Sequence, residues 1–476
     1  MESGGRARPR LNLLESEHIA AIHAGSLRIL RELGLRVDSE RARRVFARGG
    51  REVHIEDDRV TFERDVVEWA IRVSPSTVDV FDRRGAHAFR LGKDDRTRFG
   101  VGVTNLWYQD PETDGLSPFH REHMTQGVRL SESLASYDVI STLGVLRDLP
   151  PETADLYAVL EMAANSTKPL VLLISDESLF PAALELLGAV HGDVGTKPFV
   201  IPYLNPITPL TINEGTSDKL LDSIDRGLAP IFSNYGMAGM TTPITCAGTL
   251  ALLNAELLSG LVLSQLAREG APLILGSLPM FFEMKHVVDF YDPQTFLINL
   301  ACAEMMAHYE VPHAGTSGSG EGWGPDLLAA GTQWMNQLTS VVGRVGLCPF
   351  VGSSLNSKAF SPALTVYGDE VIAQARLFAE GFAVDDASLG IDEAILALRQ
   401  EGHFLMSPTT LDRYQGAYFG STFPHISLEK WEEERPVGDR LLRERTRDLL
   451  AEATAPDDHD EVLAKGEAFL SRLGRG

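Results

Sequence analysis

The stretch Ala271–Trp323 decides the fold. It begins with a short apolar run that ends in Gly276-Ser-Leu-Pro-Met-Phe-Phe-Glu283, continues with a helix pattern, and returns to an apolar run that opens into Gly315-Thr-Ser-Gly-Ser-Gly-Glu-Gly-Trp323. Short apolar runs that lead into small, aromatic and acidic residues and then into a helical period are typical of βα units. The same order recurs along most of the chain, so the repeat predicts an α/β fold.

Eight such strands, each followed by a helix pattern, are predicted between Phe99 and Glu380. Short connections imply parallel strands joined by right-handed crossovers, and the simplest closure is a (β/α)8 TIM barrel. A doubly wound open sheet is the competing arrangement, but the first strand lacks the glycine-rich phosphate turn that such sheets usually carry. The predicted strands are Phe99–Val103, Val139–Leu143, Leu170–Ile174, Phe199–Tyr203, Ala229–Ser233, Leu273–Leu275, Val311–Ala314 and Leu347–Val351.

The segments on either side of the barrel have other patterns. Residues 1–97 mix helical periods with short strand patterns and predict a small N-terminal α+β cap. The barrel itself is expected over residues 98–381. Residues 382–476 have helical spacing and become highly charged, which predicts a helical C-terminal extension that packs on the barrel or on a second subunit. A homo-oligomer is therefore expected.

The composition excludes several classes of protein. With 44% hydrophobic and 23% charged residues, the chain can bury a large core, and its formal net charge of −23 disfavours nucleic acids and anionic membrane surfaces as partners. No apolar run approaches the ~20 residues that span a bilayer. Cys246, Cys302 and Cys348 lie far apart, without zinc-ligand spacing, and the N-terminus has no apolar signal core. We expect a cytoplasmic protein with reduced thiols and no bound metal.

The loops after the strands hold the candidate site, because active sites of such barrels lie at the C-terminal ends of the strands. These loops are rich in aromatic, amide and acidic residues and poor in Lys and Arg. That lining suits a methylated ammonium group, which is held by cation–π contacts of ~0.5–2 kcal/mol each and by carboxylates. The candidate substrate-binding residues are Trp107, Tyr108, Tyr203, Asn205, Tyr235, Phe282, His313, Trp323, Phe350 and Asn356, and the candidate catalytic carboxylates are Glu283 and Glu321.

Other polar motifs are interpreted as structural. His120-x-x-His123 is expected at a solvated helix start, since no third metal ligand is near it in the sequence. Glu256 falls within a long apolar helix, where a lone carboxylate is usually paired structurally. No Gly-x-Ser-x-Gly elbow occurs, so hydrolase chemistry of that type has no support. If the substrate carries a carboxylate, the groups that could meet it are Lys285, His313 and Lys358.

A series of motifs, taken in order, resembles the trimethylamine methyltransferase family, in its branch without pyrrolysine, over nearly the whole chain. The motifs are Leu30-x-x-Leu33-Gly34-x-x-Val37, Asn205-Pro-Ile-Thr-Pro-Leu210, Thr242-Pro-Ile-Thr-x-Ala247-Gly248 with Asn254-Ala-Glu256, the segment from Leu355 to Glu370, and Gly402-His-Phe-Leu405 with Thr410-Leu411. Their order and spacing together are more specific than any one of them.

The resemblance implies a (β/α)8 methyltransferase that moves a methyl group from a methylamine or quaternary amine to the cobalt(I) of a corrinoid. The corrinoid would be carried by a separate small corrinoid-binding protein and would not be tightly bound by this chain. Family members with pyrrolysine act on trimethylamine, and relatives without it include enzymes for glycine betaine. This sequence contains no pyrrolysine, so the resemblance implies a small, betaine-like quaternary amine as the methyl donor.

The chain departs from the usual family pattern after the seventh strand. Many relatives have a Thr-Asp-Ser-Lys run followed by Asp-x-Gln-Ala-Gly, whereas here the runs are Thr316-Ser-Gly-Ser-Gly-Glu321 and Asp326-Leu-Leu-Ala-Ala-Gly331. The departure leaves the substrate and the reaction open. A non-catalytic protein that binds or senses quaternary amines on the same barrel is the alternative. An aldolase or decarboxylase would need a Schiff-base lysine or a metal cluster at a strand end, and the sequence indicates neither.

Overall fold

The computed structural model describes residues 5–93, 95–316, 320–400 and 402–473, and its centre is a closed barrel. Within these residues, eight parallel strands pair in the order β7-β10-β11-β12-β14-β15-β17-β18, and β18 pairs with β7 to complete the circle. The predicted (β/α)8 barrel is confirmed. The strands are β7 (Arg98–Val101), β10 (Val139–Ser141), β11 (Leu170–Leu172), β12 (Val200–Leu204), β14 (Ile231–Ala238), β15 (Ile274–Glu283), β17 (His313–Ala314) and β18 (Leu347–Val351).

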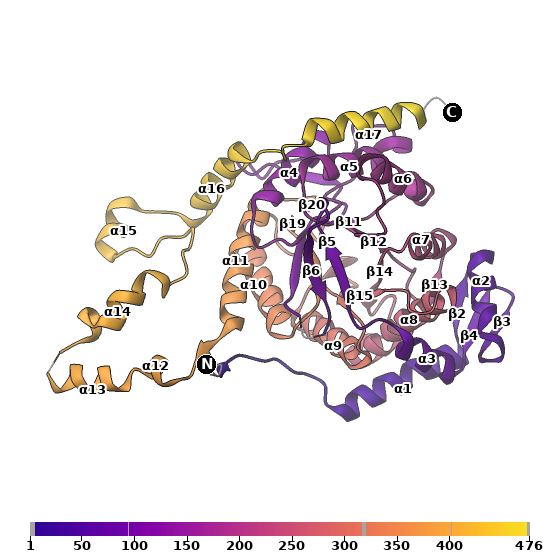
Figure 1. Cartoon of the computed structure of the whole chain (residues 1–476), viewed down its shortest axis with the longest axis horizontal. Helices are drawn as coiled ribbons and strands as arrows, with labels where there is room; N and C mark the ends of the chain where they lie inside the picture. Colours follow the sequence, from indigo (N-terminus) through magenta and orange to yellow (C-terminus); the bar gives the residue numbers. More distant parts are fainter. Residues whose placement is uncertain (1–4, 94, 317–319, 401, 474–476) are drawn as a thin grey trace.

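A helix follows each strand and packs around the outside of the barrel (Figure 1). The helices are α4 (Arg121–Ser133), α5 (Pro151–Asn165), α6 (Phe180–His191), α7 (Glu214–Asp225), α8 (Cys246–Ala267), α9 (Pro293–Tyr309), α10 (Leu327–Val342) and α11 (Pro362–Glu380). Local sequence sets where these helices start. Asp292, for example, accepts hydrogen bonds from the backbone N–H groups of Gln294 and Thr295 at the first turn of α9. Each such cap fixes the first residue of a helix and therefore the last residue of the loop that connects the preceding strand to it.

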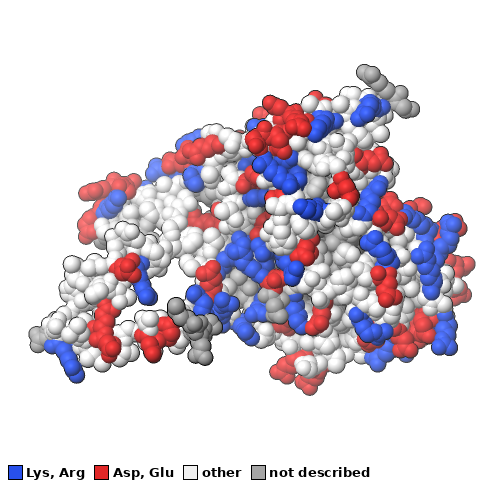
Figure 2. Space-filling model, in the orientation of Figure 1, with Lys and Arg blue, Asp and Glu red and all other residues white. Residues whose placement is uncertain are grey.

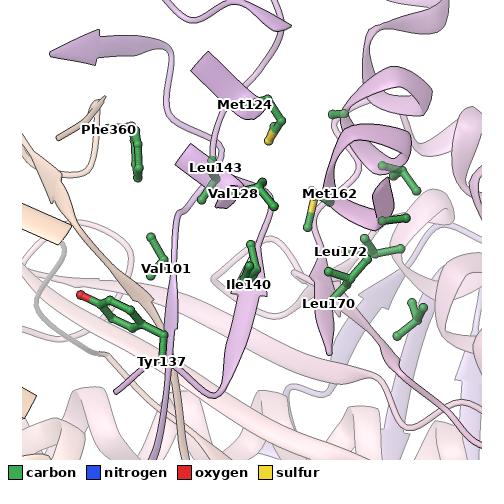
Figure 3. Packing of buried hydrophobic residues seen from close by; sticks show 14 of the residues in the cluster. Val101, Met124, Val128, Tyr137, Ile140, Leu143, Met162, Leu170, Leu172 and Phe360 are labelled. Atoms are coloured by element: carbon green, nitrogen blue, oxygen red, sulfur yellow. The ribbon is translucent and has the colours of Figure 1, made fainter. Parts of the chain in front are cut away.

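Side chains on each barrel strand alternate between the barrel interior and the helix layer. Val101, Ile140 and Leu170 share one buried cluster with side chains of α4 and α5, and Figure 3 shows them between the strands and these helices. Their neighbours Val139 and Val171 belong to a different cluster, which fills the barrel interior. A shift of one residue along a strand therefore decides whether a side chain reaches the site or the outer layer.

The N-terminal segment closes one end of the barrel. It contains α1 (Ser16–Glu32), β2 (Leu35–Val37), α2 (Glu40–Phe46), β3 (Val53–Glu56), β4 (Arg59–Phe62), α3 (Arg64–Val73), β5 (Val78–Phe81) and β6 (His87–Leu91). The hairpin β5–β6 lies across the front of the barrel in Figure 1. Val80 and Phe89 from this hairpin share the interior cluster with Ile231 and Ile274 of the barrel wall. A ligand must therefore enter from the opposite end, where the strands finish.

Helix α8 is apolar around most of its circumference because other elements cover most of it. Helices α1, α3 and α9 and strand β14 pack against it. Although the sequence reading found no run of membrane-spanning length, α8 is long enough and has a mean hydropathy of 1.6 over its most apolar window. However, 72% of that window is buried inside the protein, as expected for a core helix.

The C-terminal segment divides into two parts. Helices α16 (Gly438–Glu452) and α17 (His459–Leu473) pack on the barrel, α16 against α11 and α4, and α17 against α5 and α6. Residues 382–400 and 402–437 instead form an arm that extends away from the barrel over most of its length (Figure 1). The arm contacts α11 again at Ser421–Phe423, where the Ser421 hydroxyl and the Thr422 backbone N–H donate to the Glu370 carboxylate. The arm contains β21 (Phe382–Ala383), α12 (Asp386–Leu389), α13 (Ile391–Arg399), α14 (Pro408–Arg413) and α15 (Leu428–Glu434).

Two strands run further than the sequence predicted. Strands β14 and β15 stay paired over eight residues, from Ile231 opposite Ile274 to Ala238 opposite Phe281, and β15 then turns back as β16 (Val288–Phe290). The predicted strands ended at Ser233 and Leu275, whereas the extended ladder includes Gly236 opposite Pro279, two residue types that are rare inside strands. A second small sheet joins β8 (Trp107–Gln109), β9 (Leu116–Pro118), β19 (Ser353–Ser354) and β20 (Ala359–Phe360). The extended strands form one wall above the barrel end.

Candidate functional site

Tyr203 and Phe350 form the floor of the open end of the barrel. Both belong to the interior cluster, and their rings meet edge to face with centroids 4.9 Å apart. The Tyr203 hydroxyl donates to the Ser233 hydroxyl oxygen at 2.8 Å, and the Asn205 amide donates to the Ser233 backbone carbonyl at 2.9 Å. Asn205 is exposed and follows directly after the last residue of β12, so its hydrogen bond to Ser233 holds it next to the neighbouring strand β14.

Tyr235 lies two residues after Ser233 on the extended part of β14, so its side chain points to the same side of the strand as that of Ser233. Its hydroxyl donates to the carboxylate of Asp289 on β16 and also contacts the Met280 sulfur at 3.1 Å. Phe282 is the direct partner of Asp289 in the β15–β16 pair, so the two side chains stand side by side on one face. An aromatic wall therefore carries a carboxylate at its centre.

Tyr291 lies in the segment that leads from β16 into α9 and packs in one cluster with Met280, Phe296 and Tyr235. Its hydroxyl accepts a hydrogen bond from the Thr316 hydroxyl at 3.0 Å, and its ring stacks on Phe296 with centroids 6.1 Å apart. Its backbone N–H donates to the Glu321 carboxylate. A Cβ on Gly320 would lie 2.4 Å from the Tyr291 ring, so this close approach requires glycine.

Asn356 closes the circle from the loop after β18. Its side-chain amide donates to the Asp289 backbone carbonyl at 2.7 Å, and its backbone N–H donates to the Gly320 carbonyl at 2.8 Å. Leu355, Asn356 and Ser357 all have left-handed backbone angles, with φ of 54°, 54° and 61°. Such angles cost non-glycine residues ~1–2 kcal/mol each and persist where the surroundings hold the chain in place, often at functional sites.

These contacts bring ten side chains to one end of the barrel, which we call the mouth cluster. Its members are Tyr203, Asn205, Tyr235, Phe282, Asp289, Tyr291, Thr316, Glu321, Phe350 and Asn356. Seven of them were predicted from the sequence. Ser317–Ser319, which belong to the divergent run after the seventh strand, lie outside the described residues.

The mouth cluster combines neutral phenols with carboxylates. Burial raises the pKa of Tyr203 and of Tyr235, and Tyr291 adds to both shifts, so these phenols keep their protons. Burial also raises the pKa of the Glu321 carboxyl, against the effect of the Tyr291 N–H. No Lys or Arg belongs to the mouth cluster as the described residues define it. A cation is therefore the ligand charge that this lining suits.

The remaining predicted residues lie elsewhere. Trp107 is 41% exposed on β8, and Trp323 is 73% exposed on the loop before α10. Tyr108 packs outside the barrel wall, stacked on His123 with ring centroids 4.0 Å apart, and burial raises its pKa to about 12. Glu283 lies at the turn of the β15–β16 hairpin, where it accepts hydrogen bonds from the backbone N–H groups of Lys285 and His286.

His313 is buried behind the barrel wall, not at the mouth. Its neighbour Ala314 belongs to the interior cluster, so the imidazole faces the helix layer. Neither ring nitrogen has a hydrogen-bond partner among the described residues, and burial lowers its pKa to about 3. Lys285 and Lys358, the other candidates for a substrate carboxylate, are both exposed.

Glu256 also lies behind the wall, where it supports the loop after β12. Its carboxylate accepts hydrogen bonds from the Thr208 hydroxyl at 2.8 Å, the Leu210 N–H at 2.5 Å and the Asn234 amide at 3.0 Å. Burial raises its pKa to about 7, and these three donors oppose that shift. The structural role expected from the sequence agrees with this position.

Asp289, Tyr291 and Thr316 are the members that sequence reasoning missed. Asp289 belongs to β16 and Tyr291 follows it directly, in a part of the chain for which the sequence predicts no strand. The signal that was available is the alternation Val288-Asp-Phe290-Tyr, with polar or phenolic groups at every second position. Within the described residues, no group of three or more His, Cys, Asp or Glu side chains is arranged to hold a metal.

Comparison with known proteins places the chain in a family. The family model described as trimethylamine methyltransferase (MTTB) matches residues 3–473. A glycine betaine methyltransferase of Desulfitobacterium hafniense (strain Y51) is 24% identical over 99% of both chains. A trimethylamine methyltransferase MttB of Desulfitobacterium hafniense (strain DSM 10664 / DCB-2) is 25% identical over 83% of this chain and 80% of its own length.

A solved structure, the monomethylamine methyltransferase of Methanosarcina barkeri, aligns over 92% of this chain and 94% of its own, with 12% identity and a TM-score of 0.47. The family assignment rests on the sequence match, which runs through the cap, the barrel and the C-terminal segment. The chain belongs to the trimethylamine methyltransferase (MTTB) family.

Proposed function

We propose that this protein transfers a methyl group from a small, betaine-like quaternary amine to the cobalt(I) of a corrinoid held by a separate small protein in the cytoplasm. Membership of the methyltransferase family supports the reaction class. The observation that carries the proposal is the mouth cluster, in which aromatic rings and the Asp289 and Glu321 carboxylates gather without a Lys or Arg among the described members.

When the substrate binds, its quaternary ammonium group would leave water and contact aromatic rings and carboxylates instead. A quaternary ammonium group donates no hydrogen bond, so it gains from ring faces and from nearby negative charge. Tyr235 and Phe282 supply rings beside Asp289, and Tyr291, two residues further along the chain, supplies a third ring near Tyr235. If the amine also carries a carboxylate, that group would point out of the mouth, away from Asp289 and Glu321.

Methyl transfer from a quaternary ammonium group depends more on how the C–N bond is oriented than on acid–base catalysis. When the C–N bond breaks, its electron pair stays on nitrogen, so the tertiary amine leaves neutral and needs no proton. The corrinoid cobalt(I), brought by the partner, supplies the nucleophile that accepts the methyl group. The residues of this chain hold the ammonium group, exclude water from it and align the C–N bond with the open end of the barrel. Because β5 and β6 cover the other end, the partner must approach at the mouth.

A reconstituted assay tests this proposal. The purified chain is mixed with corrinoid proteins in the cobalt(I) state and with a panel containing glycine betaine, choline, carnitine and tetramethylammonium. We expect one amine to cause the absorbance change that accompanies methylation of cobalt(I), with release of the matching tertiary amine. If calorimetry shows binding of an amine but no partner gives methyl transfer, the sensing function is favoured. If no amine binds, the mouth cluster is not a site for quaternary amines.

A further inference from the structure

Asn299 is a buried amide on α9 whose side chain reaches the end of β17. It is 1% exposed, and its amide oxygen accepts a hydrogen bond from the Thr316 backbone N–H at 3.0 Å. Helix α9 belongs to the layer outside the barrel, and Asn299 is not a member of the mouth cluster. This hydrogen bond therefore joins the helix layer to the loop that carries Thr316 and Glu321.

Gly315 lets this amide come close to the backbone after β17. A Cβ on Gly315 would lie 2.5 Å from the Asn299 amide oxygen and 2.7 Å from a methyl carbon of Val345. Contacts this short are steric clashes, so a larger residue at position 315 would force the amide and the strand end apart. Gly315 and Asn299 therefore fit each other, although they belong to different elements.

The amide nitrogen of Asn299 has no hydrogen-bond partner among the described residues. A buried amide with one unpaired end destabilises a fold relative to an apolar side chain of the same shape, such as leucine. Both ring nitrogens of the neighbouring His313 also lack a partner in that part of the chain, and its Cε1 lies 3.1 Å from the same Cβ position on Gly315. Stability alone therefore does not account for an asparagine here, whereas the hydrogen bond to Thr316 does.

Thr316 connects Asn299 to the mouth cluster. Its hydroxyl donates to the Tyr291 hydroxyl oxygen at 3.0 Å, and the Tyr291 backbone N–H donates to the Glu321 carboxylate. Phe296, which lies three residues before Asn299 on α9, stacks on the Tyr291 ring. Because residues three apart lie on the same side of a helix, one face of α9 holds Tyr291 both by its ring and, through Thr316, by its hydroxyl.

The connection from Asn299 to Tyr291 consists of groups without charge. Charged side chains are spread over the surface of the end that the β5–β6 hairpin covers (Figure 2). Asn299 instead reaches Tyr291 through an amide, a backbone N–H and two hydroxyls, which are neutral at neutral pH. An uncharged replacement of Asn299 therefore changes the geometry of the mouth cluster and leaves its charge as it is.

We propose that Asn299 is a positioning residue, which through Thr316 holds the Tyr291 ring and the Glu321 carboxylate where they contact the bound quaternary ammonium group. The inference rests on the proposed function, because it concerns the same site. Asn299 does not touch the amine and takes no part in bond breaking. It acts on the orientation of two groups that line the site, and recognition of the cation depends on that orientation.

Asn299→Leu tests the first step of this connection. Leucine has the same branched shape but accepts no hydrogen bond, so the Thr316 amide hydrogen should exchange with solvent about 10-fold faster. Asn336→Leu is the matched control, because Asn336 is 0% exposed on α10, also has an amide nitrogen without a partner among the described residues, and bonds to Ser340. Mass spectrometry with fragmentation that resolves Thr316 measures the exchange rate. This measurement uses no amine, so it is independent of the proposed function.

The pH dependence of amine binding tests the last step. Burial and Asp292 raise the pKa of Glu321, and the Tyr291 N–H opposes that rise. If Tyr291 moves in Asn299→Leu, this N–H bond weakens, and the loss of amine affinity at low pH should begin at a higher pH than in the wild type. Thr316→Val keeps the backbone bond to Asn299 but lacks the hydroxyl. It should show the same pH shift without faster exchange at Thr316.

The set of variants separates positioning from a general loss of stability. Faster exchange in Asn299→Leu, a pH shift in both Asn299→Leu and Thr316→Val, and neither change in Asn336→Leu would support the proposal. Unchanged exchange in Asn299→Leu, an unshifted pH profile in Thr316→Val, or equal changes in Asn336→Leu would overturn it. Thr316→Val is the milder substitution and decides the matter if Asn299→Leu does not fold. A wild-type chain that binds no quaternary amine would overturn the proposed function, and the exchange rates would then still show whether Asn299 holds the end of β17.

Discussion

The hydroxyl of Tyr235 on β14 donates a hydrogen bond to the carboxylate of Asp289 on β16. The two residues come from the part of the barrel wall that extends beyond the other strands, and the Asn356 side-chain amide donates to the backbone carbonyl of Asp289. The Asp289 side chain is therefore fixed beside a phenol and beside the ring of its strand partner Phe282. The relationship makes Asp289 the side chain on which recognition of a cation should depend most.

Asp289→Asn keeps the shape of this group and removes its charge. Contacts to a charged group contribute ~1.5–3 kcal/mol, so the affinity for a quaternary amine should fall about 10- to 100-fold, as measured by calorimetry. Glu283→Gln tests the catalytic role that the sequence predicted for that residue. Because Glu283 lies at the exposed hairpin turn, we expect less than about a threefold change. An equal loss in both variants would contradict the position of the site.

Tyr235 allows the ring and the hydroxyl to be tested separately. Tyr235→Phe keeps the aromatic face but removes the hydrogen bond to Asp289, whereas Tyr235→Leu removes both. A cation–π contact of up to ~2 kcal/mol corresponds to a loss of up to about 30-fold in affinity. We therefore expect the leucine variant to bind a quaternary amine at least several-fold more weakly than the phenylalanine variant. Equal affinities would show that the ring face does not contact the cation.

The barrel could be predicted from the sequence because buried parallel strands leave a clear pattern. A run such as Leu170–Leu172 is apolar on both faces and is followed by a helical period, so its place in the repeat was evident. The residues of the mouth were harder to predict because neighbouring residues on a barrel strand face opposite sides of the wall. An error of one residue in the strand register therefore moves a side chain from the barrel interior to the helix layer. His313 and its neighbour Ala314 face opposite sides of the wall, and no feature of the sequence at that point shows which is which.

The hairpin shows a second limit of sequence reasoning. Gly236 and Pro279 interrupt the strand pattern, yet they pair with each other inside the extended β14–β15 ladder. Their presence hid β16, and with it Asp289. Trp107 was predicted to line the site because it follows the first barrel strand. In the structure it is the first residue of β8, which belongs to a separate small sheet, and it lies outside the mouth cluster.

The pH dependence of amine binding should reflect Glu321. Burial raises the pKa of its carboxyl, so it loses its charge at a higher pH than a carboxyl in water. Binding of a quaternary amine should therefore weaken as pH falls through this range, and Glu321→Gln should remove that step. The phenols of Tyr203 and Tyr235 have raised pKa values, so no loss is expected up to about pH 10. Calorimetric titrations from pH 4 to pH 9 measure both the loss of affinity at low pH and the constant affinity expected at high pH. An unchanged acid limb in Glu321→Gln would show that this carboxylate does not face the amine.

His313 should control part of the acid sensitivity of folding. Burial lowers its pKa from 6.5 to about 3. Below pH 6.5 the imidazole therefore binds a proton in the unfolded chain but stays neutral in the folded chain until the pH approaches 3. Stability is fully present above pH 6.5 and is lost as pH falls toward 3, by roughly 2 kcal/mol at pH 5. His191, whose pKa burial lowers to about 4, adds to the same limb.

His313→Gln removes the titrating group, so the drop in Tm between pH 7 and pH 5 should be smaller in this variant than in the wild type. The comparison uses the difference between two pH values, so a uniform loss of stability from the substitution cancels. His54→Gln changes an exposed imidazole and serves as the control, because its side chain is 60% exposed in the folded state. The same pH-dependent drop in His313→Gln and in the wild type would show that the imidazole reaches water or a partner when the protein is folded.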